Sequence, residues 1–227
     1  MIDIVYEDGE ALVIDKPAGL SIDRPRKGGA SLEDHLEALK LGFQRPPVAV
    51  HRLDTDTSGC LLLARNPKAL KRFNRAFEDR LVEKSYIGLV AGPVAESEGT
   101  IELSLSKISS AEKGWRMIPA RKGKPAITHW TKLAELGGGI TLVRFMPVTG
   151  RTHQIRIHAL AGLGHALVAD PVYGSPSPRA KRTMLHAEKL VVRRDGKTPI
   201  EAVAPLPADF VALGVDPALV APPASDG

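Results

Sequence analysis

The amino-acid sequence predicts an α+β domain built around a largely antiparallel sheet. Short apolar segments of strand length are joined by short turns along most of the chain, and a few stretches with helical spacing interrupt them. The chain has 227 residues, of which 43% are hydrophobic. A chain of this size buries a substantial core without disulfides or a structural metal. The length suits one ordinary domain or two very small ones.

The N-terminal part begins with alternating apolar and polar residues that lead into a buried strand at 11–14. Proline and glycine within 16–19 end this strand in a turn. Ser31 and Asp34 have the spacing of a capping box. A helical stripe of leucines follows, which predicts a helix here: Leu32, Leu36 and Leu39.

The next part of the chain has a strand, a helix and a strand in succession. A buried strand is expected at 59–64. Asn66 and Pro67 are a typical N-cap and first-turn proline, so a helix begins there. Its basic residues lie largely off one face, and that face carries the apolar residues Leu70, Phe73 and Phe77. A second strand is expected at 86–90.

Three further strands are expected at 101–105, 126–133 and 140–146. The polar segment 106–124 between the first two has the character of a mobile insertion or an extended hairpin. A helix is expected over 152–163, ended by the glycines that follow it. The chain is rich in proline and alanine from Pro205 onward, so we expect this part, and 211–227 in particular, to be poorly ordered.

Composition limits the class of protein. No apolar stretch has the length of a membrane span, and the first eight residues carry acids where a secretory signal is basic, so we expect the cytosol. The single cysteine, Cys60, excludes an internal disulfide and a zinc site of several thiolates. In its apolar segment it has the setting of a small buried residue.

The distribution of charge favours a polyanionic partner. The net charge is +5, and both 65–84 and 179–197 contain seven basic residues. Clusters of this kind are typical of surfaces that contact a phosphate backbone. A solvated helix face gives the same pattern, and charge alone does not separate the two interpretations.

Three polar clusters carry candidate chemistry. The first, 51–59, places Asp54 beside a basic pair and before a buried strand. The second is 83–86, and the third, 150–158, gathers two arginines and two histidines at the start of the last predicted helix. Helix starts favour anions, and arginines bind phosphate or carboxylate. The residues alone are compatible with a catalytic aspartate and arginine or with a structural ion pair.

Taken together, in order and spacing, these clusters resemble the RluA-type RNA pseudouridine synthases over about residues 2–210. Matching segments lie along the whole of that span: Lys16-Pro17-Ala18-Gly19, His51-Arg52-Leu53-Asp54 with Thr57-Ser58-Gly59, Lys84-Ser85-Tyr86, Gly150-Arg151-Thr152-His153-Gln154-Ile155-Arg156-Ile157-His158, Gly164-His165, Asp170-Pro171-Val172-Tyr173-Gly174 and Leu185-His186-Ala187.

The resemblance implies the pseudouridine synthase fold, in which a mixed, largely antiparallel sheet with flanking helices carries a central active-site cleft. It implies that 1–210 is the catalytic domain. It also implies that Asp54 is the essential carboxylate, which acts on the target uridine as a nucleophile or as a base at the ribose. The isomerisation involves no net oxidation or hydrolysis, so no cofactor is expected.

The resemblance assigns further roles by position. Tyr86 matches the residue that stacks on the target base, and Arg156 matches the partner of the catalytic carboxylate, whose charged form such a partner favours. Leu185 matches an apolar residue of the uracil pocket. Arg52 matches the residue that fills the gap left by the flipped base. Further candidates for RNA contact are His51, Lys16, Arg151 and the basic helix 68–75.

Three features have simpler interpretations. His153 and His158 lack a carboxylate that would complete a metal site, so no metal is expected. The segment 170–174 is best explained as a structural turn near the site. Trp115 either stacks on a base or packs against the body of the protein, and packing is favoured.

We therefore expect an isomerase that converts uridine to pseudouridine in a stem-loop of ribosomal or transfer RNA. We expect it to act as a monomer without an obligatory protein partner or membrane. No small RNA-binding domain is expected before the catalytic body, so 106–124 contributes to site selection. The alternatives are a non-catalytic RNA-binding or ribosome-assembly protein of this fold, and a hydrolase using Asp54 and His51.

Overall fold

The structure is a computed structural model that describes residues 2–25, 28–110 and 114–221. The chain forms two compact units, each of which gathers segments that are distant in sequence. Unit 1 comprises 1–86 and 185–205, and unit 2 comprises 87–184 and 206–227. Each unit has hydrophobic core clusters of its own. That 1–210 form a single catalytic domain stays a prediction.

Unit 1 is a sheet in which β2 (Ala11–Lys16) pairs with β1 (Asp3–Glu7) and β4 (Ser58–Ala64) in antiparallel register. The short strand β3 (Val48–Ala49) also pairs with β4. The strand β10 (Leu185–Arg194) runs parallel to β4 and antiparallel to β11 (Lys197–Val203). One parallel pair among antiparallel ones makes this sheet mixed, as the sequence predicts.

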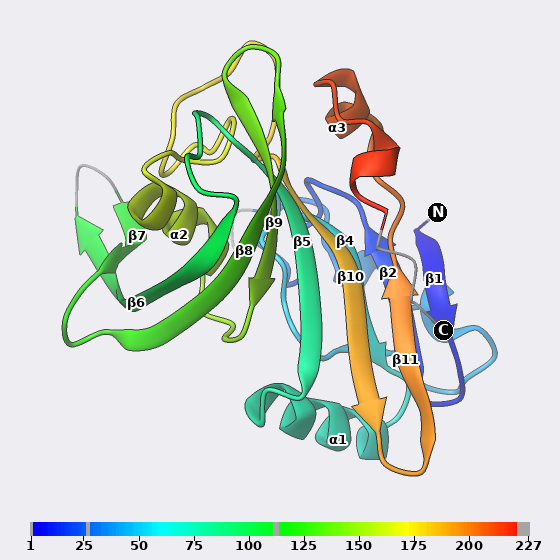
Figure 1. Cartoon of the computed structure of the whole chain (residues 1–227). Helices are drawn as coiled ribbons and strands as arrows, with labels where there is room; N and C mark the ends of the chain where they lie inside the picture. Colours follow the sequence, from blue (N-terminus) through cyan, green and yellow to red (C-terminus); the bar gives the residue numbers. More distant parts are fainter. Residues whose placement is uncertain (1, 26–27, 111–113, 222–227) are drawn as a thin grey trace. The chain divides into compact units, whose positions relative to one another are not determined.

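Unit 2 contains an antiparallel sheet in which the long strand β8 (Lys124–Leu136) lies between β6 (Glu98–Ser110) and β9 (Ile140–Pro147). The strand β7 (Gly114–Pro119) extends it by pairing with β6. The segment 106–124 is therefore an extended hairpin, apart from 111–113, which lie outside the described residues. The helix α2 (Gln154–Leu163) contacts β6, β7 and β8 (Figure 1).

The strand β5 (Val82–Val90) contributes its first residues to unit 1 and its last ones to unit 2. With the helices, these strands confirm the predicted α+β class and the strands expected along the chain. The strands β10 and β11 were not among the expected elements, beyond the motif at the start of β10.

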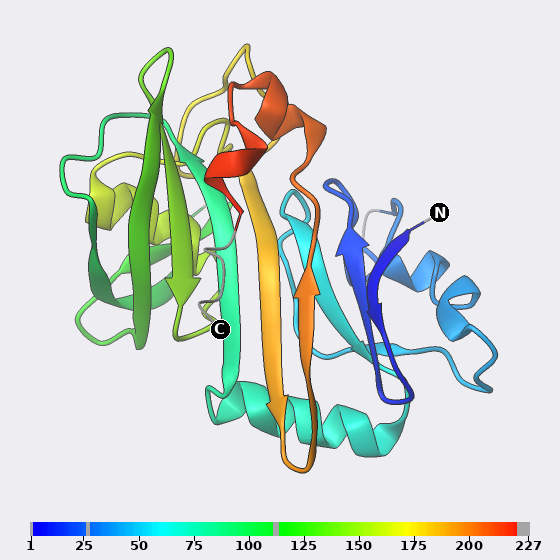
Figure 2. The ribbon, with the colours of Figure 1, turned by 45° about the vertical axis from the view of Figure 1, so that its right-hand side comes forward.

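The helix α1 (Pro67–Glu78) begins as the sequence predicts. The side chain of Asn66 accepts a hydrogen bond from the backbone N–H of Ala69 at 2.9 Å, and Pro67 occupies the first turn. Phe73 is fully buried in a core shared with β2, β4 and β10. Figures 1 and 2 show α1 lying across the ends of β10 and β11.

The helix predicted from the leucine stripe is wrong in its type. The structure has two short 3-10 turns, η1 (Leu32–Asp34) and η2 (Ala38–Lys40), instead of one α-helix. The capping box is present, since the Asp34 carboxylate accepts the backbone N–H of Ser31 at 2.9 Å. The three leucines still pack on one core. A short segment anchored at both ends by apolar contacts meets this demand without a continuous helix.

The segment after Pro205 corrects the expectation of poor order as far as 221. It forms α3 (Ala208–Ala212) and η3 (Pro217–Leu219). Phe210 is fully buried, and Leu213 and Val215 join it in a core of unit 2. These apolar side chains anchor the segment, which its high proline and alanine content had obscured. Residues 222–227 lie outside the described part of the chain.

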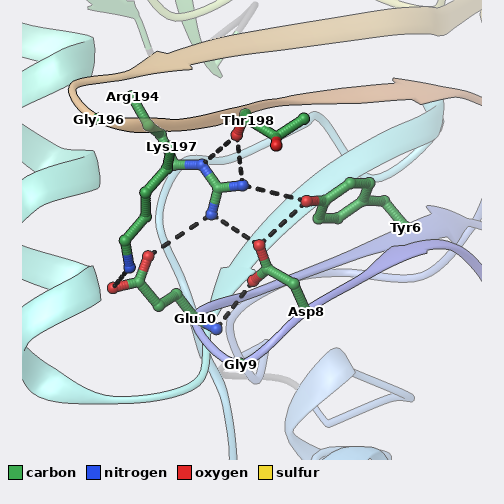
Figure 3. A pocket seen from close by; sticks show the side chains of 8 residues that line it. All are labelled: Tyr6, Asp8, Gly9, Glu10, Arg194, Gly196, Lys197 and Thr198. Atoms are coloured by element: carbon green, nitrogen blue, oxygen red, sulfur yellow. Dashed lines mark hydrogen bonds and ion pairs between the residues drawn. The ribbon is translucent and has the colours of Figure 1, made fainter.

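A network of charged side chains joins the β1–β2 turn to the β10–β11 turn in unit 1 (Figure 3). Arg194 donates to the Asp8 carboxylate at 2.6 Å and to the Tyr6 hydroxyl at 3.1 Å. Glu10 pairs with Lys197 at 3.0 Å and with Arg72 of α1. Burial tends to raise the pKa of Asp8, but backbone N–H groups and Arg194 lower it to about 2. The network ties both turns to α1.

Candidate active site

Asp54 lies on the loop that leads into β4, and a tight turn holds the loop in place. Its backbone carbonyl accepts the N–H of Thr57 at 3.1 Å, while the carbonyl of Thr55 accepts the N–H of Gly19 at 2.9 Å. Leu53, one residue earlier, is buried, and Asp54 itself is half-buried. The carboxylate therefore sits on a loop fixed on both sides by backbone contacts.

Lys16 helps to hold the loop of Asp54 in place. This side chain is fully buried, and its ammonium donates to the carbonyls of Pro17, Leu20 and Thr55 at 2.8–3.1 Å. A buried ammonium requires such partners because desolvation penalises an unpaired charge. This position corrects the expectation that Lys16 contacts the RNA backbone: it links the Pro17–Gly19 turn to the loop of Asp54 instead.

His51 also holds the loop. Its Nε2 accepts the backbone N–H of Leu62 at 3.0 Å, and its ring stacks on Phe77 of α1 with centroids 4.8 Å apart. Burial, and then the nearby charge of Lys84, lower the pKa of His51 to about 3. A neutral ring that accepts a backbone hydrogen bond is a structural residue in this position. The RNA contact predicted for His51 is not among these interactions and stays a prediction.

Arg52 stands between His51 and the buried Leu53, and its side chain points outward. Its side chain is 77% exposed, and its guanidinium lies 3.8 Å from the carboxylate of Asp23. An ion pair this exposed contributes little stability and opens easily. Arg52 is thus available to an external partner, as its predicted role requires.

Tyr86 is the residue that unit 1 brings close to Asp54. It packs against the core that contains Leu53 and Ala187. Burial raises the pKa of the Tyr86 hydroxyl, and the negative charge of Asp54 raises it further. The phenol therefore stays neutral at physiological pH, and the electrostatic effect places the two predicted catalytic groups in one neighbourhood.

The same unit places Leu185 at the start of β10. This residue is buried, and His186 and Ala187 after it pair in parallel register with Ser58 and Gly59. The Ser58 hydroxyl lies 2.9 Å from Nδ1 of His186. The strand that follows the Asp54 loop is thus joined to the strand that Leu185 begins.

Arg156 and Arg151 belong to unit 2, at the start of α2. Arg156 is buried and forms a two-pronged pair with Asp170, with Nε–Oδ2 at 2.7 Å and Nη2–Oδ1 at 2.8 Å. Burial tends to raise the pKa of Asp170, but the Arg156 guanidinium lowers it below its usual value. Arg151 is half-buried and donates to the carbonyl of Pro125 at 3.1 Å. That Arg156 also serves Asp54, and that Arg151 contacts RNA, stay predictions.

The sequence did not indicate that Asp170 pairs with Arg156. Its Oδ1 also accepts the backbone N–H groups of Val172 and Tyr173 at 2.9 and 3.0 Å. The segment 170–174 is therefore a turn, in agreement with the structural interpretation, but a turn whose aspartate also orients a predicted site residue. The spacing of 14 residues between Arg156 and Asp170 gives no local signal for this pair.

Gln154 is a second residue that sequence reasoning missed. It is buried at the first position of α2, and its amide donates to the carbonyl of Ile127 and the hydroxyl of Thr128, both at 2.9 Å. Its Oε1 accepts the Thr149 hydroxyl at 2.7 Å and the Arg151 N–H at 3.0 Å. These bonds fix the start of the helix against β8. Roles were predicted from the sequence for the charged residues around Gln154, and none for Gln154 itself.

Comparison with known proteins decides the family. The sequence profile of the RNA pseudouridylate synthases matches residues 10–161, which include the Asp54 loop, Tyr86 and the start of α2. The chain belongs to this family, and to its RluA type. It is therefore an isomerase that acts on RNA.

Relatives of this chain within the family match nearly its whole length. An uncharacterised RNA pseudouridine synthase of Zymomonas mobilis is 51% identical over 93% of this chain and 96% of its own length. The dual-specificity RNA pseudouridine synthase RluA of Haemophilus ducreyi is 38% identical over 84% of this chain and 86% of its own.

Among solved structures, human RNA pseudouridylate synthase domain containing 1 superposes with a TM-score of 0.77. It is 31% identical over 93% of this chain and 87% of its own. This likeness confirms the predicted pseudouridine synthase fold. No helix in 2–25, 28–110 or 114–221 is both long and apolar enough for a membrane span.

His158, on α2 of this pseudouridine synthase, gives a prediction about pH. It is fully buried, and neither ring nitrogen has a hydrogen-bond partner among the described residues. Burial lowers its pKa from the ordinary 6.5 to about 4. As the pH falls, His158 therefore binds a proton near pH 6.5 in the unfolded chain but only near pH 4 in the folded protein. Stability falls as the pH drops from about 6.5 toward 4.

The His158→Leu variant should lose this dependence, because leucine takes no proton. Between pH 7.5 and pH 5, the free energy of unfolding, measured with urea, should fall by about 2 kcal/mol more in the natural protein than in the variant. The exposed His129 offers a matched control, since His129→Leu should keep the slope of the natural protein. An unchanged slope in His158→Leu would show that His158 already binds a proton in the folded state.

Proposed function

We propose that this enzyme isomerises uridine in a stem-loop of transfer or ribosomal RNA, with Asp54 as the catalytic carboxylate. The observation that carries the proposal is the pairing of a rigidly held Asp54 with a half-buried, neutral Tyr86 in one unit. Relatives support the substrate class: the matched RluA of Haemophilus ducreyi is named as a dual-specificity RNA enzyme. A relative in Rickettsia bellii is named for the large ribosomal subunit.

The reaction breaks the bond from N1 of uracil to C1′ of ribose and forms a bond from C5 to C1′. The hydrogen at C5 leaves as a proton, and N1 gains one, so atoms and electrons balance without a cofactor. The Asp54 carboxylate starts the reaction, either by adding to a carbon or by removing a proton from the sugar. Tyr86 stacks on the uracil, and its neutral hydroxyl is suited to carry a proton.

Other residues have supporting roles in the proposal. Arg156, oriented by Asp170, is the proposed partner of the catalytic carboxylate in the reaction. Leu185 lines the uracil pocket. Arg52, exposed and weakly paired, fills the space that the flipped uridine leaves, and a planar guanidinium suits stacking on bases. Flipping costs a few kcal/mol, which such contacts offset.

The proposal includes the setting of the enzyme. We propose that it acts in the cytosol as a monomer, without an obligatory protein partner, and that Arg151 and the basic face of α1 contact RNA phosphates. The exposed basic residues of α1 are Lys68, Lys71 and Arg75.

Deletion of the gene and mapping of pseudouridine across all stable RNAs tests the substrate class. We expect one or a few sites in transfer or ribosomal RNA to lose pseudouridine, and a plasmid with the natural gene to restore them. A plasmid encoding Asp54→Asn should restore none. Restoration by this variant would favour a non-catalytic RNA-binding protein that assists another enzyme, and a loss confined to other RNA classes would overturn the proposed substrate.

A further inference from the structure

Trp115 lies on β7 and is unusually exposed for a tryptophan. Its side chain belongs to the β6–β7 hairpin, opposite Ser109, and 46% of it is open to solvent. Trp130, on β8 of the same sheet, shows the other behaviour, with 5% exposed. Exposure of so much aromatic surface is unfavourable in a free protein, whereas it is common in surfaces that bind.

The Trp115 ring is held in position although it is exposed. It stacks on His153, with ring centroids 4.9 Å apart and planes inclined by 27°. Nδ1 of His153 lies 2.9 Å from the hydroxyl of Tyr173, and this hydroxyl accepts the backbone N–H of Met117 at 2.9 Å. His153 thus connects the hairpin to the turn at 170–174. A fixed ring loses little conformational freedom when a ligand binds.

The backbone of His153 indicates that this position is imposed. Its φ angle is 52°, in the left-handed region that non-glycine residues seldom adopt. The same residue immediately precedes α2, and Arg156 in that helix has its guanidinium 5.1 Å from the Tyr173 ring. The stack is therefore built on residues next to the proposed site machinery within unit 2.

The charge around Trp115 identifies the ligand class. The Lys107 ammonium lies 4.8 Å from the centre of the Trp115 ring, a cation–π contact that an exposed lysine readily exchanges. From 103 to 126 the sequence contains six basic residues and one acid, Glu112. Four of the basic side chains are exposed in the structure: Lys107, Arg121, Lys122 and Lys124. A flat ring among cations suits a base with its phosphates.

We propose that Trp115 is a stacking platform for an unpaired nucleobase of the RNA substrate, other than the uridine being modified, with Lys107 binding an adjacent phosphate. The proposal rests on RNA being the substrate, as in the proposed function. It gives the β6–β7 hairpin a part in recognising the RNA. Trp115 packs on His153, as the sequence favoured, and the proposal adds a stacking role for its exposed part.

Binding of the full chain to RNA tests the platform. The probes are transfer RNA transcribed without modification and a dodecamer of uridylate, with inorganic polyphosphate as a ligand that has charge but no bases. Trp115→Ala should weaken binding of both RNAs about 5- to 100-fold. Trp115→Phe should recover most of the affinity, and polyphosphate should bind all three proteins equally.

A fluorescence measurement keeps the test independent of any folding defect in Trp115→Ala. In Trp130→Phe, Trp115 is the remaining tryptophan, since the chain has two. Saturating RNA should quench its emission, whereas saturating polyphosphate should not. Equal RNA affinity in Trp115→Ala, an equal loss for polyphosphate, unquenched emission, or no binding of either RNA would each overturn the proposal.

The same proteins separate this inference from the proposed function. Pseudouridine formation is measured in parallel on the transfer RNA transcript and on transcripts of ribosomal RNA. Pseudouridine formed with RNA affinity independent of Trp115 would overturn the platform alone. Stacking on Trp115 without pseudouridine in any of these RNAs would overturn the proposed function alone.

Discussion

Replacement of Asp54 by asparagine should lower the rate of pseudouridine formation at least about 10³-fold, within the range that a catalytic acid–base group contributes. Asparagine has nearly the same shape, but its amide neither attacks carbon nor accepts a proton at neutral pH. The Asp54 turn is closed by its backbone carbonyl, which the asparagine variant retains. The melting temperature should therefore stay close to that of the natural protein.

Asp56 offers a matched control two residues away. It is a half-buried carboxylate on the same loop, and the family motif gives it no catalytic part. Asp56→Asn should keep activity within about tenfold, corresponding to less than about 1.4 kcal/mol. Single-turnover rates and circular dichroism on the same samples separate chemistry from folding. Equal losses in the two variants would mean that the loop, and not the Asp54 carboxylate, is what the reaction needs.

The second large effect is expected at Gly59, in β4. Its φ angle is +108°, and a Cβ at this position would lie 2.2 Å from the backbone oxygen of Ala187. The two residues are partners in the parallel β4–β10 pair, so the strands would have to separate. We expect Gly59→Ala to lower the free energy of unfolding by about 3 kcal/mol or more.

Thermal unfolding measures this change. A loss of that size lowers the melting temperature of a chain of this length by about 6–12 °C. Gly196 is the matched control, since it also has a positive φ, of +65°, but open space where a Cβ would lie. Gly196→Ala should cost only about 1–2 kcal/mol, the strain of the left-handed backbone. Equal costs at the two glycines would contradict a close approach of β4 to β10.

Local signals predicted the local structure well. Asn66 and Pro67 mark the start of α1, and Gly164, with a φ of 80°, ends α2. Each of these signals acts within one turn of the chain, so composition and spacing are sufficient. The leucine stripe failed because its spacing is compatible with two short 3-10 turns packed on the same core.

The residues of the candidate site stay predictions from the family motif, and the contacts that support them required the structure. The family motif identifies Asp54, Tyr86 and Arg156, whereas the burial of Lys16 and its three carbonyl partners required the structure. The Arg156–Asp170 pair likewise joins residues far apart in sequence. Long-range contacts of this kind depend on how strands and turns pack, which periodicity along the chain does not record.

The most direct test of the catalytic role of Asp54 uses RNA labelled with tritium at C5 of uridine. Formation of the C5–C1′ bond releases that tritium into water, and the product remains in the chain. On unmodified transfer and ribosomal RNA transcripts, the natural enzyme should release tritium in equal number to the pseudouridines formed, with no free uracil. Asp54→Asn should release almost none. Free uracil or cleaved RNA would reveal a hydrolase, and undiminished tritium release by Asp54→Asn would contradict the catalytic role of Asp54.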